Sequence, residues 1–377
     1  MMWLFIGAAW ALTPEEAVRA ALSHAPDVAA AEGRVDAARG ALAASQGLSA
    51  NPTLNGRVGR ERLELEFTQA VSLTGAGRTA AGAARSEVEA AEAALTRARL
   101  VAAAETRRAY VRAAAAETRS ALADREREMA RRLREAAEAR VKAGAAAELE
   151  AQVARLGEAR AMGAWIGAVD AAATARAALA ALVAAPVDAL ATDPMAAAPP
   201  DVSAKPGARS DVLAAQAATE AARKALASQR AGALPPVLLG AFYERDGQDV
   251  VAGAAFSVAV PVWHRNEAGI GAARGDLRAA ESAEMSLFAR ASEEQRGAAR
   301  RLSVLAGALG NDLSADAEAA LAALEGAVTA GQLSPMEAAN LRARVYEGQA
   351  GWIAARAAAA EARIDAALAV DSDGLLP

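Results

Sequence analysis

The chain has 377 residues, of which 54% are hydrophobic and 3% aromatic, and it contains no cysteine. The net charge of −5 comes from interspersed acidic and basic residues, which argues against a nucleic-acid-binding surface. The absence of cysteine excludes disulfides, thiolate metal sites and a lipid anchor attached through cysteine. Alanine, glutamate, arginine and leucine dominate, a composition typical of long helices and coiled coils.

Residues 1–11 form a short apolar segment that ends in Ala9-Trp10-Ala11. The Ala-x-Ala pattern matches a signal-peptide cleavage site, so we expect export and a mature chain that starts near Leu12. No later segment stays apolar and uncharged for about 18 residues, which predicts that the chain has no transmembrane helix. A role within a membrane would therefore need strands.

The first repeat is expected over residues 12–184, and it begins with helices. Thr13 caps a short helix that runs to about residue 23, with Pro14 in its first turn. A second helix is expected over 27–46, and Asn51-Pro52 then stops helical geometry.

A β-hairpin is predicted over residues 53–71. From residue 63 onward apolar and polar residues alternate, which indicates a strand with one apolar and one wet face. Leu63, Leu65 and Phe67 share the apolar face, and Arg62, Glu64 and Glu66 share the other.

A long helical hairpin is predicted over residues 78–182. The helical pattern of 78–143 has no strong breaker, and at about 1.5 Å per residue it would be roughly 100 Å long. A glycine turn at Gly144 precedes a return helix over 148–182. Helices of this length need lateral partners, as in coiled coils.

A proline-containing linker is expected over 185–208, and the second repeat covers 209–369. Its β-hairpin spans 236–260, and its helical hairpin spans 266–369, with a bend near 310–312 and a tip at Gly331. Residues 370–377 form a tail. In this hairpin the predicted apolar face holds Val250, Phe256, Val258 and Val260, and the other face holds Ser257.

Paired landmarks in the sequence show the duplication. Asp27-Val28 corresponds to Asp211-Val212, and Trp165-Ile166 corresponds to Trp352-Ile353. The two Pro-x-Leu-x-Gly segments at 52–56 and 236–240 also match. The predicted fold is therefore mainly α with a small β part, in which a strand hairpin and a long α-helical hairpin occur twice.

This frame resembles the TolC-type outer-membrane efflux factor family over residues 12 to about 369. The opening helix from Leu12-Thr13-Pro14-Glu15-Glu16 is similar to the first helix of that family, and Asn51-Pro52-x-Leu54 is similar to its first strand entry. The junction Val260-Pro261-Val262-Trp263-His264-Arg265-Asn266 resembles the heavy-metal (CusC/CzcC-like) branch. The tip segment 330–337 is also similar to the corresponding segment of that family.

The resemblance implies a homotrimer in the outer membrane of a Gram-negative-type cell, with a closed β-barrel in lipid and a periplasmic helical tunnel. It further implies a passive conduit in a tripartite efflux system, fed by a periplasmic adaptor and an inner-membrane pump of the resistance-nodulation-division type. Heavy-metal cations are the suggested substrates. On this basis the adaptor would dock at the helical tips, at Gly144, Gly331, Leu333 and Ser334. The apolar strand residues would face lipid, and the polar strand residues would face the lumen of the barrel.

Other interpretations remain open from the sequence. The strands could form one face of a soluble sheet, and the whole chain could be a periplasmic or cytosolic coiled-coil scaffold without a pore. The two histidines, His24 and His264, stand alone without cysteine, so no metal or cofactor site is predicted. No catalytic constellation is present either, and an enzyme is not expected.

Overall fold

The computed structural model describes residues 11–46, 51–190, 193, 209–260, 263–308, 313–330 and 332–377. The expected signal peptide, most of the linker, the bend at 310–312 and the tip residue Gly331 lie outside these ranges. The chain divides into two compact units. We call them the sheet unit (residues 27–98 and 207–293) and the helical unit (residues 1–26, 99–206 and 294–377).

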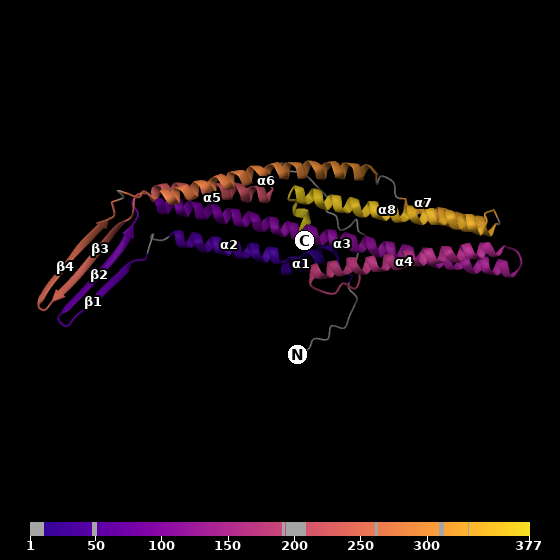
Figure 1. The fold of residues 1–377 in the computed structure, drawn as a ribbon, viewed down its shortest axis with the longest axis horizontal. Coiled ribbons are helices and arrows are strands. Elements are labelled where there is room, and N and C mark those ends of the chain that lie inside the picture. The colour runs from indigo at the N-terminus through magenta and orange to yellow at the C-terminus, as the bar shows by residue number, and fades with distance from the viewer. Residues whose placement is uncertain are drawn as a thin grey trace. The chain divides into compact units, whose positions relative to one another are not determined.

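The sheet unit holds a four-stranded antiparallel sheet in the order β1-β2-β3-β4 (Figure 1). The strands are β1 (Thr53–Val58), β2 (Arg62–Val71), β3 (Val237–Asp246) and β4 (Asp249–Val258). β2 and β3 pair over ten residues, so the hairpins of the two repeats join at their inner strands. β1 and β4 are left as the edges of the sheet.

Short turns close the two hairpins. Asp246 pairs with Asp249 across a two-residue turn in which Gly247 has a φ of +58°, a conformation that favours glycine. In the first hairpin the Gly59 N–H donates to the Arg62 carbonyl oxygen at 2.6 Å. The Gly247 N–H also donates to the carbonyl oxygen of Glu61 at 2.8 Å, which ties the second turn to the first.

Helices continue from the sheet within the same unit. α2 (Pro26–Ser45) and α5 (Ser210–Ala231) occupy equivalent places in the two repeats, beside the first parts of α3 (Ala76–Lys142) and α6 (Glu267–Ala308). Polar contacts join them: Arg39 pairs with Glu92 at 2.8 Å, and the Lys224 ammonium donates to the Ser86 hydroxyl at 2.9 Å.

The helical unit contains α1 (Pro14–His24), α4 (Glu148–Val183), α7 (Ser314–Thr329), α8 (Pro335–Ala369) and the rest of α3 and α6, followed by a 3₁₀ turn, Asp373–Leu375. Small alanines let these helices pack closely around a few larger side chains. The fully buried large residues are Leu100, Tyr110, Leu179, Ile364 and Leu375.

Residues 187–190, at the start of the expected linker, and the expected tail are packed into this core. The Leu12 N–H donates to the Ala189 carbonyl oxygen at 2.9 Å, and Val187 is buried. At the C-terminus, Leu375 is completely buried, and its carbonyl oxygen accepts a hydrogen bond from Arg107 Nε at 2.9 Å. Residues 187–190 and the C-terminal segment therefore belong to the folded unit.

α3 is continuous over 67 residues, whereas its counterpart ends at Ala308 and resumes at Ser314. α4 is the one helix in the described ranges that is long and apolar enough to cross a membrane by length and composition. α4 does not meet the requirement for about 18 consecutive uncharged apolar residues, because Asp170 and Arg176 interrupt its apolar stretch. Arg176 is paired with Glu117 of α3 at 2.5 Å.

Candidate functional site: sheet faces and helical tips

The pairing register collects the predicted apolar strand residues on one face of the sheet. Directly paired residues point to the same side. Leu63 faces the same side as Arg245 and Val250, and Leu239 the same side as Phe256. The large apolar residues on this face are Leu54, Val58, Leu63, Leu65, Phe67, Val71, Val237, Leu239, Tyr243, Val250, Phe256 and Val258, and Arg245 and Gln69 lie on the same face. Val260 lies two residues beyond the end of β4.

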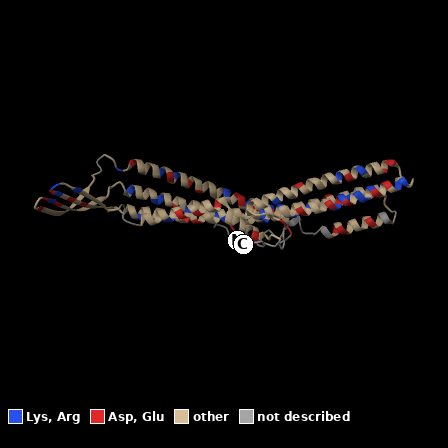
Figure 2. Ribbon diagram, turned by 90° about the horizontal axis from the view of Figure 1, so that it is seen from below, with Lys and Arg blue, Asp and Glu red and all other residues tan. Residues whose placement is uncertain are grey.

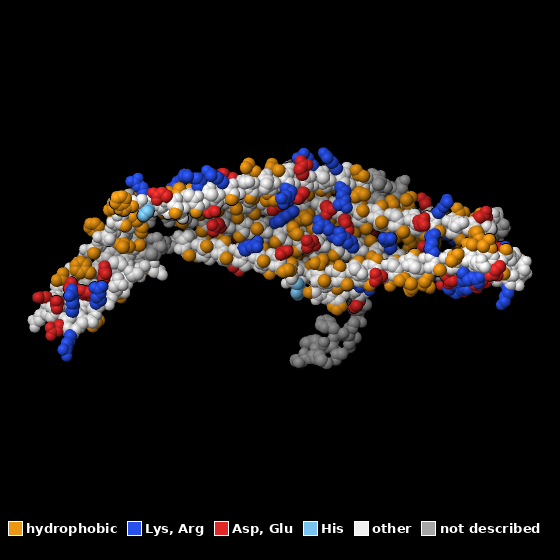
Figure 3. Space-filling model, in the orientation of Figure 1, with side chains coloured by type: hydrophobic (Ala, Val, Ile, Leu, Met, Phe, Trp, Pro, Cys, Tyr) orange, Lys and Arg blue, Asp and Glu red, His pale blue; other side chains and the backbone are white. Residues whose placement is uncertain are grey.

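The opposite face carries the predicted polar residues. Arg62, Glu64 and Glu66 lie there together with Glu244, and Ser257 pairs with Leu238 on the same side. Arg62 Nη2 approaches Glu244 Oε1 at 2.5 Å and Glu64 Oε1 at 2.8 Å. These charges gather toward the hairpin turns, where Figure 2 marks acidic and basic residues on the ribbon and Figure 3 shows their side chains together.

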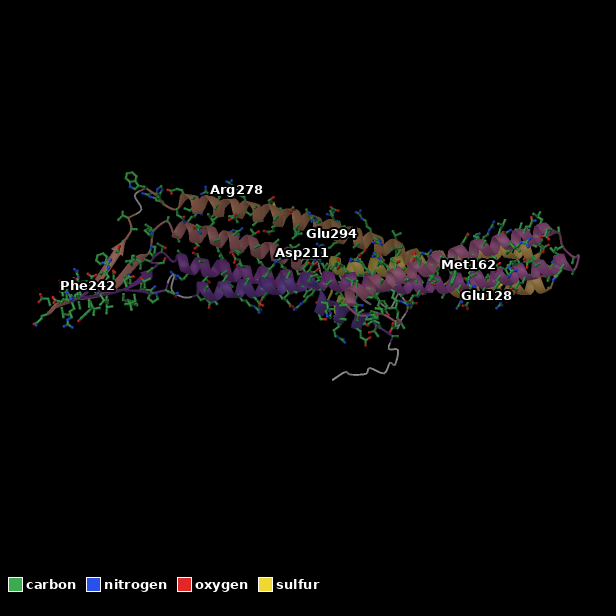
Figure 4. All side chains as sticks on the ribbon, turned by 60° about the horizontal axis from the view of Figure 1, so that its bottom comes forward. Glu128, Met162, Asp211, Phe242, Arg278 and Glu294 are labelled. Carbon is green, nitrogen blue, oxygen red and sulfur yellow. The ribbon has the colours of Figure 1, made fainter. Side chains whose placement is uncertain are left out.

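Both faces of the sheet are open in the single chain. Every residue of β1 and β4 is exposed, and Phe256 is 80% exposed. Two glycines accommodate large neighbours: a Cβ at Gly253 would lie 2.8 Å from the Phe242 ring, and one at Gly56 would lie 3.4 Å from Leu65. Phe242 is marked on the sheet in Figure 4. The sheet is therefore amphipathic, and both of its faces are accessible in the single chain.

The first helical tip is a compact turn between α3 and α4. Gly144 has a φ of +72°, and its N–H donates to the Val141 carbonyl oxygen at 2.9 Å. The Ala145 N–H donates to the carbonyl oxygen of Arg140 at 2.8 Å, so backbone groups at the end of α3 are satisfied within the turn.

The second tip lies between α7 and α8, and two of its three predicted residues are described. Ser334 caps α8: its hydroxyl accepts from the Glu337 N–H at 3.2 Å, while Glu337 Oε2 accepts from the Ser334 N–H at 3.0 Å. Leu333 donates its N–H to the Ala327 carbonyl oxygen at 3.3 Å. The two tips thus end in different local structures despite the repeat.

Ion pairs cross between α3 and α4 above the first tip. Arg134 Nε lies 2.6 Å from Glu158, and Arg155 lies 3.5 Å from Glu138. On α3 itself, hydrogen bonds from Arg131 hold the pKa of Glu128 at about 2. This hairpin therefore presents a dense, mixed charge pattern.

A groove between α3, α4 and α8 contains residues that the sequence analysis did not single out. Arg342 of α8 is 6% exposed; it contacts Met129 Sδ at 3.4 Å and Glu325 at 3.9 Å. Burial raises the pKa of Glu126 and of Tyr346 in the same groove. Arg342 and Tyr346 lie four residues apart on one helix. This spacing in the sequence is the pattern that could have predicted that both side chains share one helix face.

No cluster of three or more histidine, aspartate or glutamate side chains suited to a metal occurs among the described residues. Trp165 lies under the Arg127 guanidinium, 4.9 Å from the ring centroid. This contact agrees with a packing role for that tryptophan.

Comparisons with known proteins define the fold. No family model matches the chain, and no curated protein matches it. Solved structures do match: a membrane protein from Pseudomonas aeruginosa has a TM-score of 0.77 at 19% identity, covering 95% of this chain and 90% of its own. The outer membrane protein VceC from Vibrio cholerae has a TM-score of 0.69 at 20% identity, covering 95% of each chain.

CusC, described as forming a transmembrane channel, has a TM-score of 0.73 at 16% identity, covering 97% of this chain and 95% of its own. The chain therefore has the fold of TolC-type outer-membrane channels. The similarity to CusC is no greater than that to the Pseudomonas protein, so the fold does not single out the heavy-metal branch.

Proposed function

We propose that the chain is the outer-membrane channel subunit of a tripartite efflux system. The observation that carries this is the bare sheet, with an apolar face, a charged face and two unpaired edges. Unpaired edges cannot sit in lipid, because each exposed backbone group there costs several kcal/mol. Pairing β4 of one copy with β1 of the next removes the edges, and three copies would give a closed twelve-stranded barrel.

In this barrel the apolar face contacts outer-membrane lipid and the face of Arg62, Glu64, Glu66 and Ser257 lines the lumen. The long helices form the periplasmic tunnel. Each tip, at Gly144 and at 331–334, receives a periplasmic adaptor that connects to an inner-membrane pump of the resistance-nodulation-division type. The channel is a passive conduit, and heavy-metal cations are the substrate class that the junction sequence 260–270 favours.

The barrel is tested by purification in detergent, light scattering and planar-bilayer recording. We expect a trimer that conducts ions. A soluble monomer without conductance would instead support the coiled-coil scaffold.

The two faces are distinguished by neighbouring residues of β2 in the cysteine-free chain. Glu66→Cys should react with a charged, membrane-impermeant thiol reagent and reduce the conductance. Phe67→Cys, on the opposite face, should leave the conductance unchanged under the same treatment. Block of the Phe67→Cys channel alone would reverse the assignment of the faces.

Substrate class is tested in cells that lack other exporters. If heavy-metal cations are the substrate, deletion of the chain should raise cellular metal content without changing resistance to organic compounds. The opposite pattern would replace metal cations by organic substrates.

A further inference from the structure

The strands leave the sheet at one common end, where the helices begin. Val71, Val237 and Val258 are paired with one another across β2, β3 and β4, so the end of β2, the start of β3 and the end of β4 coincide. The segments that follow or precede these residues therefore flank the same end of the sheet unit.

Large apolar side chains on these flanking segments are exposed. Trp263 is 85% exposed and Leu73 is 77% exposed. Among the large hydrophobic residues near this end, only Phe256 has an exposed fraction between these two values. Val260 and Leu234 are 75% and 60% exposed. Figure 3 shows hydrophobic side chains gathered where the strands meet the helices.

Three exposed arginines lie within a few residues of this apolar group: Arg78 in the first turn of α3, Arg230 at the end of α5 and Arg265 before α6. None of them forms an ion pair of 4.0 Å or less among the described residues, although Arg265 interacts electrostatically with Glu267. In the flanking segments 72–85, 228–236 and 263–275, Glu267 is the only carboxylate. That carboxylate accepts a hydrogen bond from the Arg265 N–H at 2.9 Å.

The two ends of the sheet thus differ in charge balance, in a chain whose net charge is −5: the helix end is basic, whereas the hairpin-turn end is close to neutral. At the hairpin turns, Glu61, Glu64, Glu244, Asp246 and Asp249 outnumber the nearby arginines Arg57, Arg60, Arg62 and Arg245. At the helix end, arginine outnumbers carboxylate. Contact with water alone is unfavourable for the exposed tryptophan and for its aliphatic neighbours.

We propose that Leu73, Leu234, Val260, Trp263, Arg78, Arg230 and Arg265 form a junction collar that binds the headgroup region of anionic phospholipid. Tryptophan prefers the boundary between hydrocarbon and water, and guanidinium groups next to it attract lipid phosphate. The collar fixes how deep the barrel sits and selects anionic over zwitterionic lipid. This inference rests on the proposed membrane location of the sheet.

The test uses tryptophan fluorescence in vesicles. Trp263 is kept as the single tryptophan by Trp3→Phe, Trp10→Phe, Trp165→Phe and Trp352→Phe in the full chain. A matched protein keeps Trp165 of α4 instead and carries Trp263→Phe. Both are reconstituted in phosphatidylcholine vesicles that contain equal mole fractions of chain-brominated phosphatidylglycerol or brominated phosphatidylcholine.

We expect bromolipid to quench Trp263 but not Trp165, and brominated phosphatidylglycerol to quench Trp263 more strongly. The preference should be about fivefold in relative association constant for each arginine engaged. It should disappear in Arg78→Gln/Arg230→Gln/Arg265→Gln and persist in Arg34→Gln/Arg278→Gln/Arg290→Gln, whose exposed arginines lie along α2 and α6 (Arg278 is marked in Figure 4).

Three results would overturn the collar. Trp263 quenched equally by both lipids would remove the anionic preference, and an unquenched Trp263 in protein that floats with vesicles would place the junction outside the bilayer. Protein that does not float with vesicles at all would overturn the membrane location itself, and with it the proposed channel.

Discussion

The Arg62 guanidinium of β2 and the Glu244 carboxylate of β3 meet at 2.5 Å across the seam where the hairpins of the two repeats join into one sheet. Glu64 lies on the same face and contacts the same guanidinium at 2.8 Å. One arginine therefore offsets two carboxylates that come from different halves of the duplicated chain.

Removal of that arginine should alter the ion selectivity of the proposed pore. In Arg62→Gln, Glu64 and Glu244 keep their charge without a counter-charge, so the preference for cations over anions should increase. Glu244→Gln should have the opposite effect. The reversal potential in a KCl gradient measures both, and the same value in all three proteins would contradict a lumenal position of the pair.

Tyr110 joins the start of the described chain to α3. Its side chain is fully buried, and its hydroxyl donates to the Leu12 carbonyl oxygen at 2.8 Å. Tyr110→Phe should lower the free energy of unfolding by about 1–3 kcal/mol, because the carbonyl loses its buried donor. Tyr243→Phe, on the exposed face of β3, serves as the control in thermal unfolding and should change the stability little.

Leu375 is expected to matter although only two residues follow it in the given sequence. Leu375→Ala removes a completely buried side chain and should cost about 2–5 kcal/mol in free energy of unfolding. Leu149→Ala, at a side chain that is 65% exposed, is the matched control. Equal stability of the two variants in denaturant titrations would show that the C-terminal segment does not pack as described.

Two glycines of the first helical hairpin should respond to alanine in opposite directions. Gly144 has a φ of +72°, so Gly144→Ala should destabilise the hairpin by about 1 kcal/mol. Gly157 lies inside α4 with no atom within 4 Å of an added Cβ, so Gly157→Ala should stabilise it by up to about 1 kcal/mol. Denaturation midpoints that shift in the same direction would contradict the left-handed turn at Gly144.

The start of α8 should depend on pH through Glu337. Hydrogen bonds from the side chain and backbone of Ser334 hold the pKa of Glu337 below its ordinary value of 4.5. A carboxylate with a lowered pKa in the folded state adds stability that is complete above its unfolded pKa and is lost as the pH falls through the folded pKa. Amide hydrogen exchange at residues 336–339 should therefore accelerate in that acidic window.

The control for this pH effect is Glu337→Gln. The neutral amide can still reach the Ser334 N–H but does not titrate, so the pH dependence of exchange at the start of α8 should flatten. Acceleration that persists unchanged in Glu337→Gln would assign the effect to another group.

The sequence alone determined the elements and their faces. Alternation at residues 62–67 and 250–258 is a local property, and the pairing register later collected these residues on the expected sides. Continuous helix over α3 followed from the absence of breakers. The glycine turns and the Ser334 cap also depend on neighbouring residues only.

Tertiary structure decided what depends on contacts between distant segments. The burial of Leu375 under Arg107, the packing of residues 187–190 beside Leu12, and the groove around Arg342 all join residues that are far apart in the chain. No local period encodes such contacts, because an alanine-rich helix is compatible with many packing partners. The strand order, with the two hairpins joined at β2 and β3, likewise required pairing energies between the repeats that a linear pattern does not contain.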